Sequence, residues 1–146
     1  MPKGSTITAK NIEENIGFSK DFNVFELRKS LGNKEQLKSY KIVQYFANNP
    51  KDNNIVMVVG LVFSFFVQVL KYHGIKDKNP ANVAKVLGVN PFFLKDYDIA
   101  LKNYPMKKVS QIVNALRDVD VKSKGVGANA MPLDDLYKEL LINIFN

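Results

Sequence analysis

The chain contains no cysteine and no tryptophan, and it has a single histidine among its 146 residues. Without cysteine it can form neither disulfides nor thiolate metal sites, which is compatible with a reducing cytoplasm. A catalytic dyad built on imidazole would have to use His73, whose position just before a glycine suits the end of a helix better. The sequence also lacks the P-loop pattern. We therefore predict no catalytic residues, no metal ligands and no cofactor.

Arginine is scarce, because Arg28 and Arg117 are the only two in a chain with 21 basic and 14 acidic side chains. The guanidinium fork is the group that recognises phosphates and guanines through paired hydrogen bonds. The net charge of +7 comes from dispersed lysines, with no basic run longer than two. This excess favours acidic partners, nucleic acid first among them, but a lysine-rich surface of no specific function explains it equally well.

One apolar run, residues 55–70, raises the question of a membrane span. A spanning helix needs about 20 apolar residues, and this run is shorter and is interrupted by Ser64 and Gln68. The first residues also lack the apolar stretch of a secretory signal. We interpret the run as a core helix, apolar on all sides, in which Gly60 lets a neighbouring helix approach closely. The expected location is cytoplasmic, with no membrane association.

Helix signals occur throughout the rest of the chain. Asparagine before proline pairs a good N-cap with the residue that suits the first helical position, and glycine ends several apolar segments. Residues 55–59 are rich in β-branched side chains, but no second strand-like run exists to pair with them, and no internal repeat appears. The sequence therefore predicts an all-α compact bundle of about seven helices. The expected helices begin at Thr8, Asn23, Asn33, Ile55, Asn79-Pro80, Asn90-Pro91, Pro105 and Pro132, with a flexible connector at residues 124–129.

Residues 80–103 have a helix–turn–helix form, which gives an alternative function: a stand-alone DNA-binding protein. The second helix would read bases with its first residues, which include Phe92, Phe93 and Leu94. These side chains are apolar, whereas base edges are recognised through hydrogen bonds. A hairpin that simply packs into the bundle is the better interpretation, and DNA reading stays as the second hypothesis.

Several segments also follow one another in a recognisable order. They are residues 15–27, the apolar run at 56–72, the step Ala84-Lys85-Val86-Leu87-Gly88-Val89-Asn90-Pro91-Phe92, the helix end at 116–124 and the last apolar helix at 136–145. In this order they resemble the C-terminal domain of the bacterial DNA polymerase III delta subunit, and the resemblance covers the chain from about Ile7 onward.

The resemblance implies a domain division and a role. Residues 1–22 would be a lead-in segment with a short helix from a preceding domain, and residues 23–146 a helical collar domain for oligomerisation. In that family the delta subunit is part of the clamp loader, which places the sliding clamp on primed DNA during replication. The collar domain would pack with those of the gamma/tau and delta-prime subunits. The clamp itself would be contacted only by an N-terminal domain that this chain does not contain.

The resemblance also implies that the chain has no enzyme activity of its own, although the complex around it is a DNA-directed DNA polymerase holoenzyme. The family's delta subunit has no working ATP site. An apolar surface deprived of its partners would make self-association of the isolated chain an expected property.

The last helix is the candidate for the partner interface, because its apolar residues wrap more than one face. An equally open alternative is that this helix closes the bundle, since both roles use the same residue types. Near the connector, Lys122 and Lys124 are candidates for contact with DNA phosphates. The interface candidates are Leu136, Tyr137, Leu140, Leu141, Ile144 and Phe145.

Overall fold

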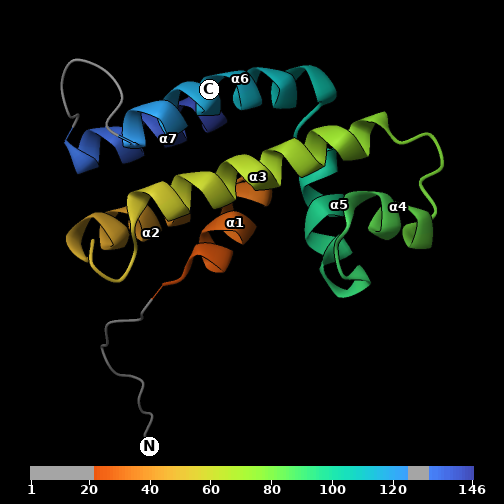
Figure 1. Ribbon diagram of the computed structural model, residues 1–146, viewed down its shortest axis with the longest axis horizontal. Helices are drawn as coiled ribbons and strands as arrows, with labels where there is room; N and C mark the ends of the chain where they lie inside the picture. Colours follow the sequence, from red (N-terminus) through yellow and green to blue (C-terminus); the bar gives the residue numbers. More distant parts are fainter. Residues whose placement is uncertain (1–21, 125–131) are drawn as a thin grey trace, which may run out of the picture.

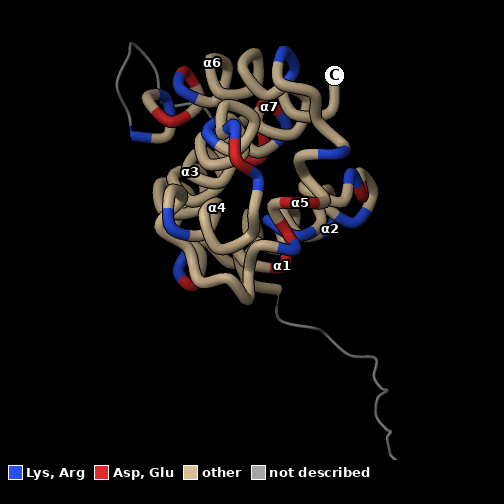
Figure 2. Tube along the Cα trace, turned by 90° about the vertical axis from the view of Figure 1, so that its right-hand side faces the viewer, with Lys and Arg blue, Asp and Glu red and all other residues tan. Residues whose placement is uncertain are grey.

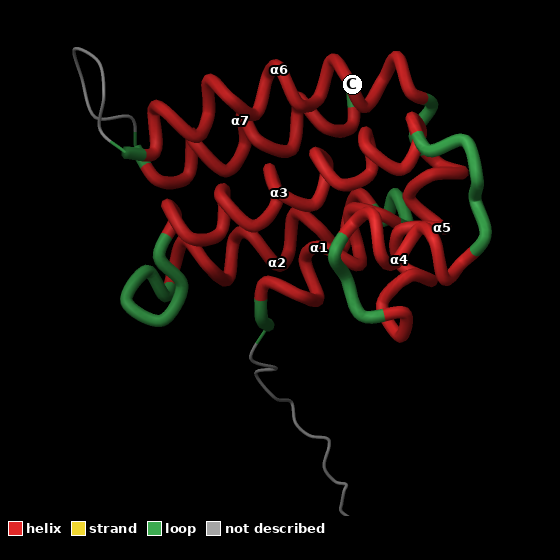
Figure 3. The backbone as a smooth tube through the Cα atoms, turned by 45° about the vertical axis from the view of Figure 1, so that its right-hand side comes forward, coloured by secondary structure: helices red, strands yellow, loops and turns green. Residues whose placement is uncertain are grey.

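The computed structural model describes residues 22–124 and 132–146, and helices make up most of both ranges (Figures 1 and 3). No strand occurs in these ranges, which confirms the predicted all-α fold of about seven helices. The helix predicted at Thr8 and the connector after Lys124 lie outside the described residues. The elements are α1 (Val24–Gly32), α2 (Gln36–Asn48), α3 (Ile55–Gly74), α4 (Pro80–Leu87), the 3-10 turn η1 (Pro91–Phe93), α5 (Leu94–Asn103), α6 (Met106–Ser123) and α7 (Leu133–Phe145).

Local side-chain caps set several of the helix boundaries. The side chain of Asn23 accepts a hydrogen bond from the backbone N–H of Glu26 at 3.0 Å, and Asn79 accepts one from Ala81 at 3.1 Å. Each cap satisfies a backbone donor that the first turn of a helix leaves without a partner. At the other end of α4, Gly88 takes the left-handed conformation, with φ of 68°. The starts predicted at Asn23 and at Asn79-Pro80 are therefore confirmed.

Two other predicted starts differ from the structure. Asn33 does not open a helix: it caps the end of α1, and Lys34 follows with φ of 58°, so that α2 begins only at Gln36. Lys34 thus takes a conformation that most residues with a side chain avoid. Asn90 does cap the next segment, but that segment is first the 3-10 turn η1 (Pro91–Phe93), and the α-helix begins after it.

The helices close a ring around one core. Along the ring α1 packs on α2, α2 on α7, α7 on α6 and α6 on α3, and α3 and α5 return to α1 (Figure 1). In this view α3 crosses the middle of the molecule, between the pair α6–α7 and the group α1, α2, α4 and α5. The short helix α4 packs against α3 at one end of the ring and adds Val83 and Leu87 to the same core.

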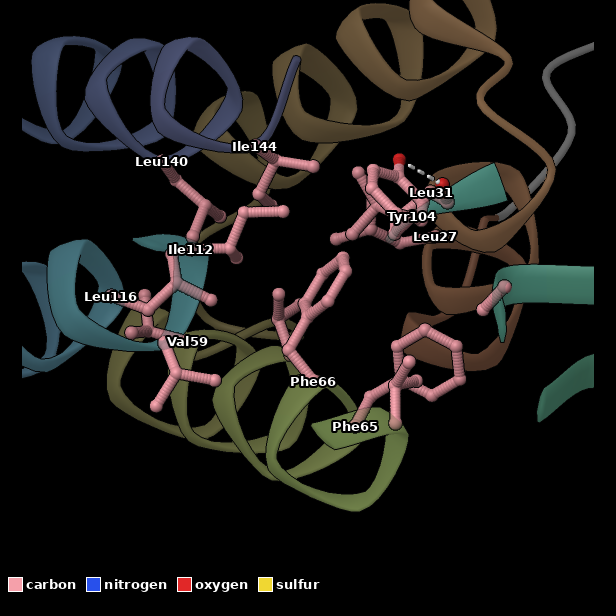
Figure 4. Close-up of a cluster of buried hydrophobic side chains, with 14 of the residues drawn as sticks. Leu27, Leu31, Val59, Phe65, Phe66, Tyr104, Ile112, Leu116, Leu140 and Ile144 are labelled. Carbon is pink, nitrogen blue, oxygen red and sulfur yellow. Dashed lines mark hydrogen bonds between the residues drawn. The ribbon is translucent and has the colours of Figure 1, made fainter. Parts of the chain in front are cut away.

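Large apolar side chains from all seven α-helices of the described chain and from the turn before α6 meet in this core, part of which is drawn in Figure 4. Phe66 of α3 lies edge-on to the ring of Tyr104, with centroids 5.4 Å apart. Ile112 and Leu140, from α6 and α7, are fully buried beside them. Each such side chain stabilises the fold by about 1.5–3 kcal/mol relative to an exposed one. The interior is therefore shared by elements from both ends of the chain.

Tyr104 ties the α5–α6 turn to the end of α1. Its hydroxyl donates a hydrogen bond to the carbonyl oxygen of Leu31 at 2.5 Å, and the neighbouring side chain of Asn103 donates one to the carbonyl of Gly32 at 2.8 Å. Carbonyls at a helix end have no partner within the helix, so these bonds satisfy them. His73 Nε2 lies 2.8 Å from the carbonyl oxygen of Tyr104. His73 thus has a structural contact, but with the turn before α6 and not with the end of its own helix.

We expect Tyr104→Phe to keep the fold and to lower the free energy of unfolding by about 1 kcal/mol, because it removes one buried hydrogen bond and leaves the ring in place. Urea denaturation followed by circular dichroism measures the change. Tyr40→Phe is the matched control, since the hydroxyl of Tyr40 makes no hydrogen bond within the described chain. Equal stability of the two variants would show that the Tyr104–Leu31 bond contributes nothing.

Candidate partner-binding surfaces

The apolar residues of α7 lie in the core of the chain itself. Leu136, Tyr137, Leu140, Leu141 and Ile144 are buried, packed against α2 and α6. Only Phe145, of the six interface candidates, keeps part of its surface exposed. The structure therefore corrects the partner-interface assignment for the five buried residues: they close the bundle, which was the alternative left open by the sequence. A partner surface has to be sought elsewhere.

We expect Leu140→Ala to destabilise the isolated chain by about 2–5 kcal/mol, because it leaves a cavity among fully buried side chains. Ile142→Ala on the same helix is the control, since this side chain is 48% exposed, and we expect a change within about 0.5 kcal/mol. Thermal or chemical denaturation measures both. A small effect of Leu140→Ala would contradict the core assignment.

Lys122 and Lys124 both have carboxylate partners in the chain. Lys122 Nζ lies 3.1 Å from both carboxylate oxygens of Glu139, and Lys124 Nζ lies 3.0 Å from Asp120 Oδ2. Exposed ion pairs of this kind contribute about 0–1 kcal/mol, so a phosphate could replace the carboxylates at little cost. Contact with DNA phosphates stays a prediction. In the view of Figure 2, basic and acidic segments alternate along the helices.

One uncovered apolar surface of the described chain is the outer side of α3. By length and composition this helix of 20 residues could cross a membrane, a property that core helices of soluble proteins share. Only 39% of its most apolar window is buried, although the mean hydropathy there is 2.1. We call its uncovered side the α3 outer face. It consists of the exposed Val56, Met57 and Ser64 and the half-buried Gly60, Phe63 and Val67.

Gly60 lies at the centre of the α3 outer face. A Cβ atom built on it would meet no atom within 4 Å. The prediction that Gly60 lets a neighbouring helix approach closely is therefore wrong for the described residues, because none of them packs against the space above this glycine. The open space above the glycine belongs to the surface of the described chain.

A second uncovered surface is a groove between α1, η1 and the first turn of α5. Two of its walls are aromatic: Phe25 is 61% exposed and Phe93 is 45% exposed. The Arg28 guanidinium carbon lies 5.4 Å from the ring centroid of Phe25 and 5.8 Å from that of Tyr97, which is buried below it. We call this the Arg28 groove. Its lining residues are Asn23, Phe25, Glu26, Arg28, Lys29, Phe93 and Asp96.

The electrostatics of the groove are mixed. Burial raises the pKa of the Tyr97 hydroxyl above its usual range, the charge of Arg28 opposes that rise, and the charge of Asp96 adds to it. The sequence did not indicate this site, because its two aromatic walls, Phe25 and Phe93, lie far apart in the chain. One sequence feature could have indicated the groove: the aromatic pair Phe92-Phe93 directly follows Pro91, where Asn90 caps the start of a helical turn.

The hairpin of the alternative hypothesis is present as α4, a short turn, η1 and α5. Of its proposed base-reading residues, Leu94 is buried, while Phe92 and Phe93 project from the surface with their rings edge to face at 5.4 Å. Later in the same helix, Asp98 accepts a hydrogen bond from the hydroxyl of Tyr72. This end of the hairpin therefore presents aromatic rings and not a row of hydrogen-bonding side chains.

A comparison with protein families matches residues 21–139 to one family, described as DNA polymerase III delta subunit, C-terminal domain. The match spans more than half of the chain, from the start of α1 into α7. The chain belongs to this family. No curated protein and no solved structure gives a match to it.

Membership of the delta family indicates the complex in which these surfaces occur. The C-terminal domain of delta is a non-catalytic component of the clamp loader, and a polymerase III subunit is a cytoplasmic replication protein. It interacts with other components of the loader. In the part of the chain that the structure describes, no group of three or more His, Asp or Glu side chains could hold a metal ion.

Proposed function

We propose that this chain assembles the clamp loader by packing its α3 outer face against the C-terminal domains of the gamma/tau and delta-prime subunits in a circular collar. In this role the chain catalyses no reaction. It supports the loading of the sliding clamp on primed DNA by holding the loader subunits together. One observation carries the proposal: α3 is apolar on all sides, yet the described residues leave Val56, Met57 and Ser64 on it exposed.

The α3 outer face has the composition that a helix–helix interface requires. It contains no charged side chain from Val56 to Val67, so a partner would have no ion to desolvate. Gly60 and Ser64 lie one turn apart, and small side chains there let a second helix approach at the usual 8–10 Å between axes. Each square ångström of apolar surface covered would contribute about 25 cal/mol. An exposed face of this kind also favours pairing of the isolated chain with itself.

DNA contact is the second candidate function, through the hairpin at residues 80–103. The observation that favours it is the exposure of Phe92, at 83%, beside Phe93, since exposed aromatic rings can stack on unpaired bases. Against it, Lys95 is followed directly by Asp96, so no basic stripe accompanies the rings. Within the full loader, we assign any contact with primed DNA to Lys122 and Lys124, as the sequence suggested.

The test uses two methionines of similar exposure. Met57, on the α3 outer face, is 46% exposed, and Met106, at the start of α6, is 53% exposed. Met57→Glu places a charge in the proposed interface and should weaken the complex with the other C-terminal domains by about a hundredfold. Met106→Glu should leave it unchanged. Size-exclusion chromatography with light scattering, on mixtures from one source, measures complex formation.

Two results would overturn the proposal. Complexes of equal stability with both variants would exclude the α3 outer face as the interface. Absence of any complex with the unmodified chain, together with duplex binding that falls steeply as salt increases, would favour the hairpin at residues 80–103 as the functional surface.

A further inference from the structure

We propose a second docking site in the Arg28 groove, separate from the collar interface. Its ligand is a segment of a partner protein that carries a bulky apolar side chain next to a carboxylate. The carboxylate would bind the guanidinium of Arg28, and the apolar side chain would lie between Phe25 and Phe93. Arg28 already lies close to three aromatic rings, at 5.4 Å, 5.5 Å and 5.8 Å from the centroids of Phe25, Phe65 and Tyr97.

The guanidinium is held in place without an acceptor. Its N–H groups donate no hydrogen bond to the described residues, and no carboxylate of these residues forms an ion pair with Arg28. The aromatic contacts fix the side chain through cation–π attraction, worth about 0.5–1 kcal/mol at a partly exposed site. Because the guanidinium of Arg28 is already oriented, binding of a carboxylate would cause little further loss of side-chain conformational entropy. A carboxylate is also the acceptor whose two oxygens match the fork.

The walls of the groove supply the apolar half of the site. Phe25 comes from α1 and Phe93 from η1, and both rings are more than two-fifths exposed. The open volume between the lining residues is about 320 Å³, enough for one or two side chains of a partner. Exposed aromatic rings around an arginine are the composition typical of energetic hot spots in protein interfaces.

The charges in the groove favour a peptide over a nucleic acid. Glu26 and Asp96 line it together with Arg28 and Lys29, so the lining charges balance. A phosphate backbone carries regularly repeated negative charges and would meet both carboxylates. A single carboxylate placed on Arg28, with an apolar neighbour, avoids them. The net charge of +7 on the whole chain still attracts acidic segments from a distance.

The scarcity of arginine makes the site directly observable. An ¹⁵N-labelled chain has only two arginine Nε–H groups, Arg28 and the exposed Arg117 on α6. The probe is a short synthetic peptide with one phenylalanine next to one aspartate and with both ends blocked. We expect its addition to shift the Arg28 signal to saturation and to leave Arg117 unchanged. The same peptide with asparagine in place of aspartate should bind about tenfold more weakly, since it loses the charge-assisted pair.

Neighbouring phenylalanines provide matched variants. Phe93→Ala removes a wall of the groove and should weaken peptide binding about tenfold, whereas Phe92→Ala removes a more exposed ring outside the lining and should not. Arg28→Lys keeps the charge but not the fork, and it should also weaken binding about tenfold. Met57→Glu should have no effect on peptide binding, so failure here and failure of the collar interface can be told apart.

Three outcomes would overturn the proposal. Equal shifts at Arg28 and Arg117 would mean non-specific attraction of an acidic peptide to a basic chain. Equal effects of Phe92→Ala and Phe93→Ala would exclude the groove as the binding site. Saturable shifts at Arg28 with single-stranded oligothymidylate, and none with the peptide, would identify a nucleic-acid site instead.

Discussion

The packing of α3 against α6 is the contact on which the rest of the structure depends. The inner side of α3 carries a continuous set of buried residues along the whole helix, and α6 lies along it. The remaining helices complete the same interior: α7 covers α6, α2 covers α7, and α1 and α5 close the ring on α3. None of these neighbours covers Val56, Met57 and Ser64, so the α3 outer face is left exposed in the described chain. The central core helix and an uncovered apolar surface of the described chain are thus two sides of a single element.

This geometry explains what the sequence could and could not predict. Helix starts depend on caps a few residues away, so Asn23 and Asn79-Pro80 identified α1 and α4 correctly. The choice between core and surface depends on neighbours that are remote in sequence. In α7, apolar residues on several faces left the two roles equally open, and contacts with α2 and α6 decided the question. In α3, no polar side indicates which face meets solvent, and Gly60 was therefore assigned a neighbour that the described residues do not supply.

The Arg28 groove was missed for a related reason. In α1 the residues that face the core are Val24, Leu27 and Leu31, at helical spacing, and this register turns Phe25 toward solvent. The partner wall, Phe93, lies in a turn that is remote in sequence, and its position depends on the 3-10 geometry of η1, where an α-helix was predicted to begin. Composition showed only that arginine is scarce, and the position of one of the two arginines beside three aromatic rings emerges from the structure.

The two uncovered surfaces differ in the physics of binding. The α3 outer face carries no charge, so association through it would rest on apolar burial and would depend little on salt. The Arg28 groove combines aromatic walls with an oriented cation, so salt would weaken association through it. A domain with one uncharged helical face and one charged aromatic groove can therefore bind two partners through different interactions: the collar through the face, and a separate protein segment through the groove. A single extended apolar face would instead favour pairing of the chain with a second copy of itself.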